Sequence, residues 1–201
     1  MSTEILDVAN LTIDIDGSHA VKPAIPPYPS QYVSEIWLAD GTTLRLRPIR
    51  PEDEPLIVKF HSTLSEQSVY RRYFAPLNLE NRTRHERLKR ICAVDYDREI
   101  ALIAERHRPE ESPDIVGVGR LIKYGDSEAE LAVVVSDALQ RHGIGSSLTS
   151  RLIDFARDEH LSKITASVLF ENWPMRQLLE KHGFVFEDEV GTGVLKGRLR
   201  L

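Results

Sequence analysis

Cysteine is nearly absent from this sequence, since Cys92 is the only one among 201 residues. One cysteine excludes an internal disulfide and a metal site built from several thiolates. Cys92 lies in the run LKRICAVDY, on the expected apolar face of a helix, so we interpret it as a core residue rather than a nucleophile. The seven histidines show no metal-ligand spacing such as HExxH. The sequence therefore predicts no metal site.

Long apolar runs are also missing. No run reaches the length that a membrane-spanning helix needs. The N-terminus MSTEILDVAN has neither the basic start nor the hydrophobic centre of a signal peptide. We therefore expect a soluble, cytoplasmic protein with no membrane partner.

An excess of basic residues is lacking too. The formal net charge is −5, and this argues against a broad surface for nucleic acid. Only the segment Arg82–Arg90 is locally basic. We interpret it as the solvated face of an amphipathic helix that buries Leu88, Ile91 and Cys92; the alternative is a contact surface for an acidic partner or a phosphate.

Two common nucleotide-binding patterns, GxxxxGK[ST] and GxGxxG, do not occur. The stretch ELAVVVSDALQRHGIGS, residues 130–146, instead places an apolar strand before a turn with Gly143 and Gly145, and a helical pattern follows. Glycine allows backbone N–H groups to approach an anion closely, and the first turn of a helix offers unpaired donors. The stretch therefore has the outline of a phosphate site, although a tight turn that only starts a helix fits the two glycines equally well.

The chain is long enough for one substantial core, or one domain with an appendage. Four of its eleven prolines lie between Pro23 and Pro29, and this density is typical of an extended linker. We therefore expect an N-terminal extension with a proline-rich linker at residues 1–35, including a short strand pair, and a domain at residues 36–201.

The hydrophobic pattern of that domain predicts an α/β protein with a mixed sheet and no internal repeat. Pro51 and the acidic residues after it fit the first turn of one helix, and Ser65 fits the cap of the next. Strands are expected at 42–50, 100–106, 115–124, 131–135, 163–169, 184–190 and 194–201, and further helices around 82–92, after 143 and at 172–182.

This order of elements, the hexapeptide Gln140–Gly145, and Asn172 followed by MRQLLEKHGF resemble the GNAT superfamily of acyl-CoA-dependent N-acetyltransferases. The resemblance covers residues 42–201, and the hexapeptide matches the family pattern [QR]xxGx[GA]. It implies a GNAT fold: a mostly antiparallel sheet of about six to seven strands, splayed between the fourth and fifth, with helices on both faces.

The resemblance also implies acetyl-CoA as cosubstrate. The turn would hold the coenzyme A diphosphate, the strand before it would pair with pantetheine, and Asn172 would lie beside the coenzyme, or simply cap its helix. The implied cofactor-binding residues are Val133, Val134, Val135, Gln140, Arg141, His142, Gly143, Ile144, Gly145, Ser146 and Asn172.

A narrower resemblance lies upstream. The segments DGTTLRLRPIRPEDEP, LSEQSVYRRYFAPL and VDYDREIALIAE are similar to the acetyltransferase domain of bacterial protein lysine acetyltransferases that modify acetyl-CoA synthetase. In many of these the domain follows a large domain, and ILDVANLTIDID with PPYP resembles the end of such a domain and its linker. A short natural protein and a fragment both fit. The implied partner is a protein that carries the acceptor lysine, for example an acyl-CoA synthetase.

Acetyl transfer to a lysine needs a base. At pH 7 a lysine with a pKa near 10.4 costs about 4.6 kcal/mol to deprotonate. The resemblance assigns this role to Glu130, at the start of the strand, while the residues alone favour a solvent-facing or salt-bridged carboxylate. Glu128 is the rival, since it shares the face of an ideal strand.

The sequence departs from the family at the general acid. Many GNAT enzymes use a tyrosine that corresponds here to Leu179, and no tyrosine follows Tyr124. No general acid is assigned, and a coenzyme thiol can leave without one. The resemblance further implies an oxyanion contact from a backbone N–H in the Val133–Val135 region.

The expected function is acetyl transfer from acetyl-CoA to a protein lysine in a ternary complex, without an acyl-enzyme. Arg71, Arg72 and Tyr73 are expected to border the acceptor, although packing and a surface ion pair explain them as well. Transfer to a small amine and a non-catalytic acyl-CoA sensor are the alternatives.

Overall fold

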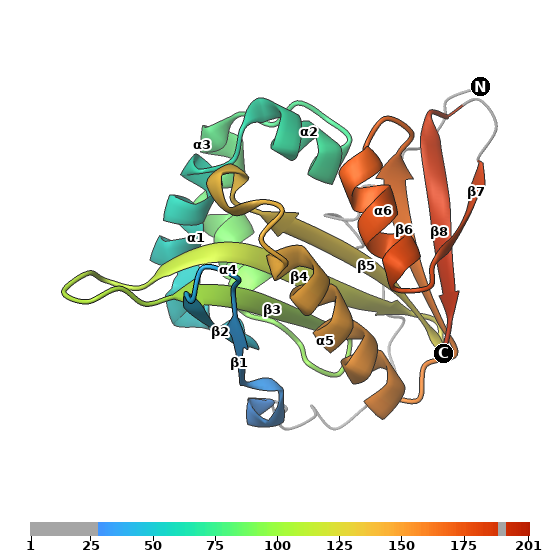
Figure 1. Ribbon diagram of the computed structural model, residues 1–201, viewed down its shortest axis with the longest axis horizontal. Helices are drawn as coiled ribbons and strands as arrows, with labels where there is room; N and C mark the ends of the chain where they lie inside the picture. The colour runs from blue at the N-terminus through green and yellow to red at the C-terminus, as the bar shows by residue number, and fades with distance from the viewer. Residues whose placement is uncertain (1–27, 189–191) are drawn as a thin grey trace, which may run out of the picture.

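The computed structural model describes residues 28–188 and 192–201. Figure 1 shows one twisted sheet with helices on both sides. The elements in chain order are η1 (Ser30–Tyr32), β1 (Ser34–Trp37), β2 (Thr43–Pro48), η2 (Pro51–Asp53), α1 (Glu54–Ser62), α2 (Glu66–Tyr73), α3 (Leu79–Arg82), α4 (His85–Cys92), β3 (Glu99–Arg106), β4 (Asp114–Tyr124), β5 (Glu128–Val135), η3 (Asp137–Leu139), α5 (Ile144–Asp158), β6 (Lys163–Leu169), α6 (Trp173–Lys181), β7 (Val185–Asp188) and β8 (Val194–Arg200).

The sheet has eight strands in the order β1-β2-β3-β4-β5-β6-β8-β7. The α/β class and the GNAT fold are therefore confirmed, but the predicted number of strands is too low by one. The additional strand is β1, which pairs antiparallel with β2. Its four residues, SEIW, are too few to show a pattern of period two, and only the pairing with β2 makes them a strand.

Strands β5 and β6 are joined at one end only. They run parallel and pair from Glu128 to Glu130 with Lys163 to Thr165. On its other side β5 pairs with β4 along its whole length, from Glu128 to Val135. Beyond Glu130, β5 therefore separates from β6 and leaves a V-shaped gap, which Figure 1 shows between the two arrows. This is the predicted splay.

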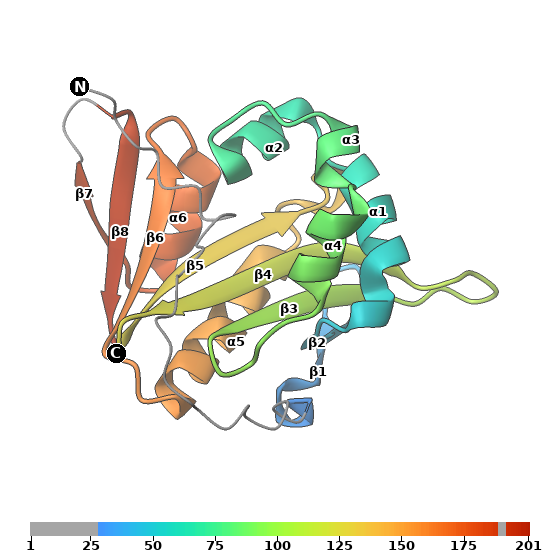
Figure 2. The same ribbon diagram turned by 180° about the vertical axis from the view of Figure 1, so that it is seen from behind.

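Two hydrophobic cores cover the two faces of the sheet. Alternating side chains of one strand enter different cores, as period two requires: Leu102 packs on the side of α5 and Ile103 on the side of α1 and α4. Figure 2 shows α1 to α4 on the face opposite α5. Cys92 lies in the second core, where burial raises the pKa of its thiol to about 11. The predicted core role of Cys92 is confirmed.

The helix boundaries follow local signals. Ser65 caps α2 by accepting a hydrogen bond from Ser68 N at 3.2 Å, and Asn172 caps α6 by accepting one from Met175 N at 3.4 Å. Gly183, with φ +88°, follows the end of α6. The predicted solvated face at 82–90 is wrong for Arg82, which is 6% exposed and donates to the carbonyl oxygens of Leu77 and His61.

A buried ion cluster fixes the start of α1 against the sheet. Arg47 donates to Asp53 through two bonds of 2.7 Å and to Glu105 through bonds of 2.7 and 3.2 Å. Burial opposes the ionisation of Glu105 and of Arg47. Hydrogen bonds outweigh burial: those to Asp53 and Glu105 raise the pKa of Arg47, and that from Arg47 lowers the pKa of Glu105.

Some predictions fall outside the described residues. These are the strand pair and most of the proline-rich linker within residues 1–27, and the end of the strand predicted at 184–190. The division into residues 1–35 and 36–201 stays a prediction. In the part of the chain that the structure describes, every helix is too short or too polar to cross a bilayer.

Candidate functional site

The turn between β5 and α5 is shaped by two residues with positive φ. Arg141 has φ +67° and Gly143 has φ +87°, and Gly143 is the residue at which α5 begins. No side chain caps this helix. Among the described residues, no acceptor is found for the N–H groups of Ile144, Gly145 and Ser146. The first turn of a 15-residue helix therefore presents three donors and the positive end of its dipole.

Gly145 serves a different purpose from Gly143. A Cβ atom at Gly145 would lie 2.9 Å from Cδ1 of Leu178, so the glycine lets α5 approach α6 closely. A Cβ atom at Gly143 would meet open space, and only its φ requires glycine. The pattern GxG thus combines a turn requirement with a packing requirement.

The polar side chains of the turn mostly bond to the protein itself. Gln140 donates from Nε2 to Ser68 Oγ at 3.0 Å and to Val135 O at 3.2 Å. Nδ1 of His142 lies 2.8 Å from the carbonyl oxygen of Gln140. In this arrangement Gln140 and His142 brace the turn, and its outward-facing groups are backbone N–H donors.

Ser146 contacts the end of α6. Its Oγ lies 2.8 Å from Nε2 of His182. Burial, and then the charge of Lys181, lower the pKa of His182, so the imidazole is neutral near pH 7. The contact joins the two helices that flank the wide end of the gap.

Asp137 connects the turn to α2. Its carboxylate accepts from Ser65 N at 2.9 Å, from Ser65 Oγ at 2.6 Å and from Ser68 Oγ at 2.9 Å. Burial opposes its ionisation, but these hydrogen bonds prevail and lower the pKa of Asp137. No local pattern reveals this link, because the partners are about seventy positions apart in the chain.

The three valines of β5 point to alternate sides. Val133 and Val135 pack on the core of α5, and Val134 packs on the core of α1 and α4. Beyond Glu130, β5 pairs with β4 alone, so the backbone groups on its other edge face the gap. These are the groups that the sequence predicts for pantetheine.

Glu130 lies where the strands begin to part, opposite Thr165. Its Oε1 accepts a hydrogen bond from Ser167 Oγ at 2.8 Å and lies 3.6 Å from Lys196 Nζ. Lys196 also donates to Ser167 Oγ at 3.1 Å. The carboxylate therefore keeps a fixed place at the apex of the gap, with one serine and one cation as neighbours.

Glu128 lies on the paired side of the apex. Its carboxylate forms an ion pair with Lys163 Nζ at 2.6 Å, and that hydrogen bond is the main cause of its lowered pKa. Tyr124 and Thr165 form a hydrogen bond of 2.9 Å nearby. A carboxylate engaged at the closed end of the V is worse placed to meet an amine in the gap than Glu130.

Two further residues of the prediction lie on α6. Asn172 is 6% exposed and caps the helix, as its alternative interpretation proposed. Leu179 is completely buried in the core, and its carbonyl oxygen accepts backbone hydrogen bonds from His182 N and Phe184 N. The position at which the resemblance implied a tyrosine therefore holds a hydrocarbon side chain in the core.

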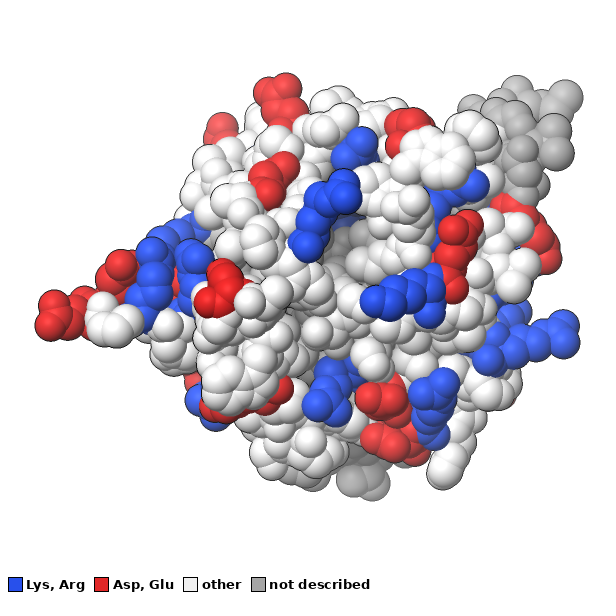
Figure 3. Space-filling view, in the orientation of Figure 1, with Lys and Arg blue, Asp and Glu red and all other residues white. Residues whose placement is uncertain are grey.

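A hollow lies over this gap. Figure 3 shows it on the face of Figure 1, with lysine and arginine side chains on either side. Among the described residues, no group of three or more His, Cys, Asp or Glu side chains is placed to hold a metal ion. The arrangement thus combines a helix N-terminus, a free strand edge and one carboxylate along β5.

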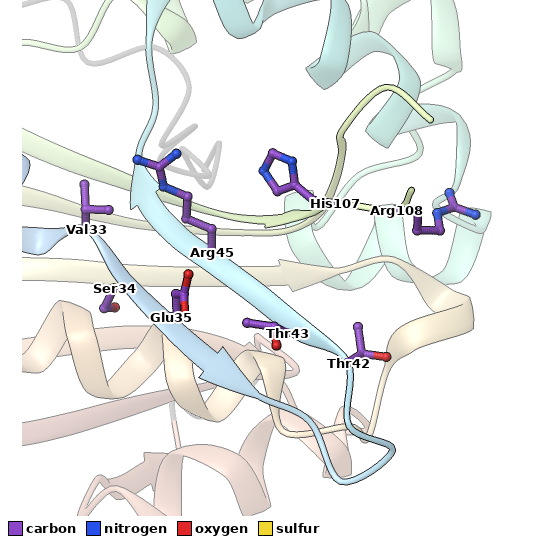
Figure 4. Close-up of a pocket in the computed structure, with 8 residues that line it drawn as sticks. All are labelled: Val33, Ser34, Glu35, Thr42, Thr43, Arg45, His107 and Arg108. Carbon is purple, nitrogen blue, oxygen red and sulfur yellow. The ribbon is translucent and has the colours of Figure 1, made fainter. Parts of the chain in front are cut away.

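A second, open pocket of about 850 Å³ lies at the other end of the sheet. Figure 4 shows Glu35 on β1, Arg45 on β2, and His107 with Arg108 after β3 around it. None of the predicted site residues lines this pocket.

Comparison with known proteins is consistent with this geometry. The family model "Acetyltransferase (GNAT) domain" matches residues 43–185. Acetyltransferase Pat of Mycolicibacterium smegmatis is 28% identical over 168 residues, which cover 82% of this chain and 46% of the relative. The chain thus spans about half the length of that curated relative.

Solved structures share the fold. The GNAT domain of S. lividans PAT superimposes with a TM-score of 0.77 at 27% identity, covering 87% of this chain and 99% of that one. RimJ of Mycobacterium smegmatis, solved in complex with CoA-disulfide, has a TM-score of 0.65 at 19% identity, covering 84% of this chain and 86% of that one. At that identity RimJ supports the fold alone.

Proposed function

Because the chain belongs to the acetyltransferase (GNAT) domain family, we propose that it transfers acetyl from acetyl-CoA to the ε-amine of a lysine in an acceptor protein. The single observation that carries this proposal is the V-shaped gap with Glu130 at its apex and the first turn of α5 at the far end of the same strand. One strand thus connects an anion site with a base.

The residues of the wide end fit the coenzyme. The N–H groups of Ile144, Gly145 and Ser146 would hold its diphosphate, since they lack protein acceptors among the described residues. The free edge of β5 from Leu131 to Val135 would bond its amides as a neighbouring strand would. When bound, acetyl-CoA supplies an activated thioester.

Glu130 acts as the base. The neutral amine attacks the thioester carbon, so a C–N bond forms and the C–S bond breaks. The amine proton passes to the carboxylate of Glu130, directly or through a water molecule. Ser167 and Lys196 hold the carboxylate in place before the amine arrives.

The departing thiolate meets no tyrosine from α6, because Leu179 occupies that position. The thiol of coenzyme A is a stable enough leaving group for transfer without a protein acid. Backbone N–H groups of the free β5 edge would stabilise the tetrahedral intermediate.

The lysine acceptor is supported by the three upstream segments, of which LSEQSVYRRYFAPL supplies α2 beside the gap. The proposal includes an acyl-CoA synthetase as one acceptor. A small amine is the competing acceptor, and binding without turnover is the competing role that the buried Leu179 motivates.

The test is incubation of the purified chain with labelled acetyl-CoA and three kinds of acceptor: an acyl-CoA synthetase, a polyamine and free amino acids. We expect label on a lysine of the protein. Glu130→Gln should lower kcat/KM by about 10²- to 10⁴-fold and leave coenzyme binding unchanged. Glu128→Gln is the matched control and should keep most activity.

Three outcomes would count against the proposal. Full activity of Glu130→Gln near neutral pH would show that Glu130 is not the base. Label on polyamine alone would replace the lysine acceptor. Tight acetyl-CoA binding by calorimetry, without thioester loss beside any acceptor, would replace catalysis with sensing.

A further inference from the structure

Two arginines flank one tyrosine next to the gap. The guanidinium carbon of Arg72 lies 5.0 Å from the ring centroid of Tyr73, and that of Arg87 lies 5.3 Å from the same centroid. Arg72 and Tyr73 end α2, and Arg87 lies on α4. The ring therefore holds two cations from two helices near each other.

Among residues 28–188 and 192–201, neither cation has an anionic partner, since no carboxylate or carbonyl oxygen there accepts a hydrogen bond from Arg72 or Arg87. Nε of Arg87 is buried and unpaired within the same residues. By contrast, nearby Arg120 donates to Glu99 at 2.6 Å and to the carbonyl oxygen of Ile91.

An unpaired guanidinium is costly when it loses water. Burial lowers the pKa of Arg72, and the charges of Arg120 and Arg87 lower it further, while Tyr73 and Glu130 act in the opposite direction. A guanidinium offers five donors in a plane, a geometry that fits a carboxylate through two parallel bonds. An anion placed between Arg72 and Arg87 would satisfy the free donors and relieve the repulsion between like charges.

Arg72 lies on the face of the sheet that carries Glu130. Val134 packs on the core of α1 and α4, and Glu130 shares its face of β5 because side chains alternate along a strand. Helix α2 contacts β5 directly. The influence of Glu130 on Arg72 agrees with this position. Arg72 and the base therefore lie on the same side of the sheet, and Arg87 lies near Arg72 at the ring of Tyr73.

We propose that Arg72 and Arg87 form a subsite for an acidic side chain of the acceptor protein, close to the lysine that is acetylated. This inference rests on the proposed function. It names a substrate class: lysines with an aspartate or glutamate nearby in the folded acceptor or along its chain. The pair is a specificity determinant, and transfer itself does not require it.

The test uses two synthetic peptides that contain one lysine and differ only in a glutamate or a glutamine near it. The wild-type chain should acetylate the glutamate peptide with a kcat/KM about tenfold higher, mainly through a lower KM, as expected for hydrogen bonds to a charged group. Arg72→Gln and Arg87→Gln should each bring the ratio close to one. Arg90→Gln, an exposed arginine of the same helix as Arg87, is the control and should keep the ratio.

Charge reversal adds a second readout. Arg87→Glu should favour a peptide that carries a lysine in place of the glutamate, which a merely misfolded variant would not do. Calorimetric binding of coenzyme A, unchanged in each variant, verifies the fold. Equal kcat/KM for both peptides with the wild type, or a preference that survives in both glutamine variants, would overturn the subsite.

Failure of the proposed function can be distinguished from failure of the subsite. If neither peptide is acetylated, calorimetry measures their binding in the presence of coenzyme A. If the wild type binds the glutamate peptide more tightly than the glutamine peptide, and Arg87→Gln abolishes this difference, the subsite is supported without catalysis. Equal binding of the two peptides by the wild type overturns it. Binding of inorganic phosphate tests whether the two arginines bind a free anion instead of an acceptor side chain. If phosphate binds through Arg72 and Arg87 while the peptides do not differ, the pair is a free-anion site and the acceptor proposal is wrong.

Discussion

The Nζ atom of Lys196 lies 3.6 Å from Oε1 of Glu130, and Ser167 Oγ donates to the same carboxylate oxygen at 2.8 Å. Strands β6 and β8 supply these two neighbours, while Glu130 comes from β5. The proposed base is therefore assembled across the apex of the gap by three strands. One of these neighbours, Lys196, lies 66 positions along the chain from Glu130.

Lys196→Met should lower kcat/KM severalfold, because the carboxylate of Glu130 then keeps only Ser167 as a partner and is held less firmly. The measurement is acetylation of one acceptor at a fixed pH. Lys181→Met, on the exposed surface of α6, is the control. An unchanged kcat/KM would show that Lys196 does not position the base.

Gly143→Ala should lower the free energy of unfolding by about 1–2 kcal/mol, because an alanine is strained at φ +87°. The site of its Cβ is open space, so the cost is conformational and not steric. Gly143→Asn should lower the free energy of unfolding by less, since asparagine tolerates this backbone region better than alanine does. The measurement is the free energy of unfolding in urea for the wild type and the two variants. Equal losses for alanine and asparagine would contradict the conformational explanation.

His61 should make the fold sensitive to acid. It is 3% exposed, and burial with the charges of Arg82, Arg87 and Arg72 lowers its pKa from 6.5 to about 4. The unfolded chain binds this proton below pH 6.5, whereas the folded chain does so only near pH 4. The free energy of unfolding therefore falls as pH decreases through this window, by roughly 2 kcal/mol between about pH 7 and about pH 5.

The measurement is urea unfolding at both pH values for the wild type and His61→Leu. The leucine variant lacks this titration, so its loss between the two pH values should be smaller by the stated amount. If both proteins lose the same free energy of unfolding between the two pH values, His61 does not contribute to the acid sensitivity.

Arg47→Met should lower the free energy of unfolding by about 3–5 kcal/mol near neutral pH, because it leaves Asp53 and Glu105 buried without their cation. The loss of stability relative to the wild type should become smaller as pH falls and Glu105 becomes neutral. This sign follows from the lowered pKa of Glu105, whose favourable pairing is present above its unfolded pKa and is lost in acid.

Arg45→Met, an exposed arginine on the same strand, is the control and should change stability by less than about 0.5 kcal/mol. Denaturant unfolding measures both variants. A deficit of Arg47→Met that stays constant with pH would show that lost packing, and not the unpaired carboxylates, destabilises it.

Asp137→Ala should weaken coenzyme A binding severalfold. The turn before α5 then loses the carboxylate that accepts from Ser65 and Ser68, and Gln140 loses an ordered partner in Ser68. Calorimetry measures the affinity, and Asp154→Ala on the partly exposed side of α5 is the control. An unchanged affinity for coenzyme A would show that the hydrogen bonds between Asp137 and α2 do not support the coenzyme turn.

Much of the fold was predictable from local patterns. Ser65 and Asn172 cap helices as their residue types suggest, and Gly143 has the positive φ that its place before a helix requires. Strand β1 was missed because four residues carry too little pattern. Arg82 was misjudged because a charged side chain in an amphipathic segment was expected in solvent, whereas backbone carbonyls of Leu77 and His61 satisfy it inside.

The candidate site was predictable only along β5. Glu130 and the glycine turn lie within one continuous stretch, so the order strand, turn and helix predicts their arrangement. Their partners come from distant segments: Ser167 and Lys196 beside Glu130, and Ser65 beside Asp137. Side chains so far apart in sequence meet only through strand pairing and helix packing, which no local pattern specifies.

The sequence by itself determined the family, the order of the elements and the two ends of the proposed site, because hydrophobic period, capping residues and glycine conformation act over a few neighbouring positions. Tertiary structure decided which groups surround that site. Parallel pairing of β5 and β6 that stops at Glu130 opens the gap, and helices α2 and α4 bring Arg72 and Arg87 to the ring of Tyr73. Long-range pairing, which sums many weak contacts across the whole chain, thus placed the cations and the base on one side of the sheet.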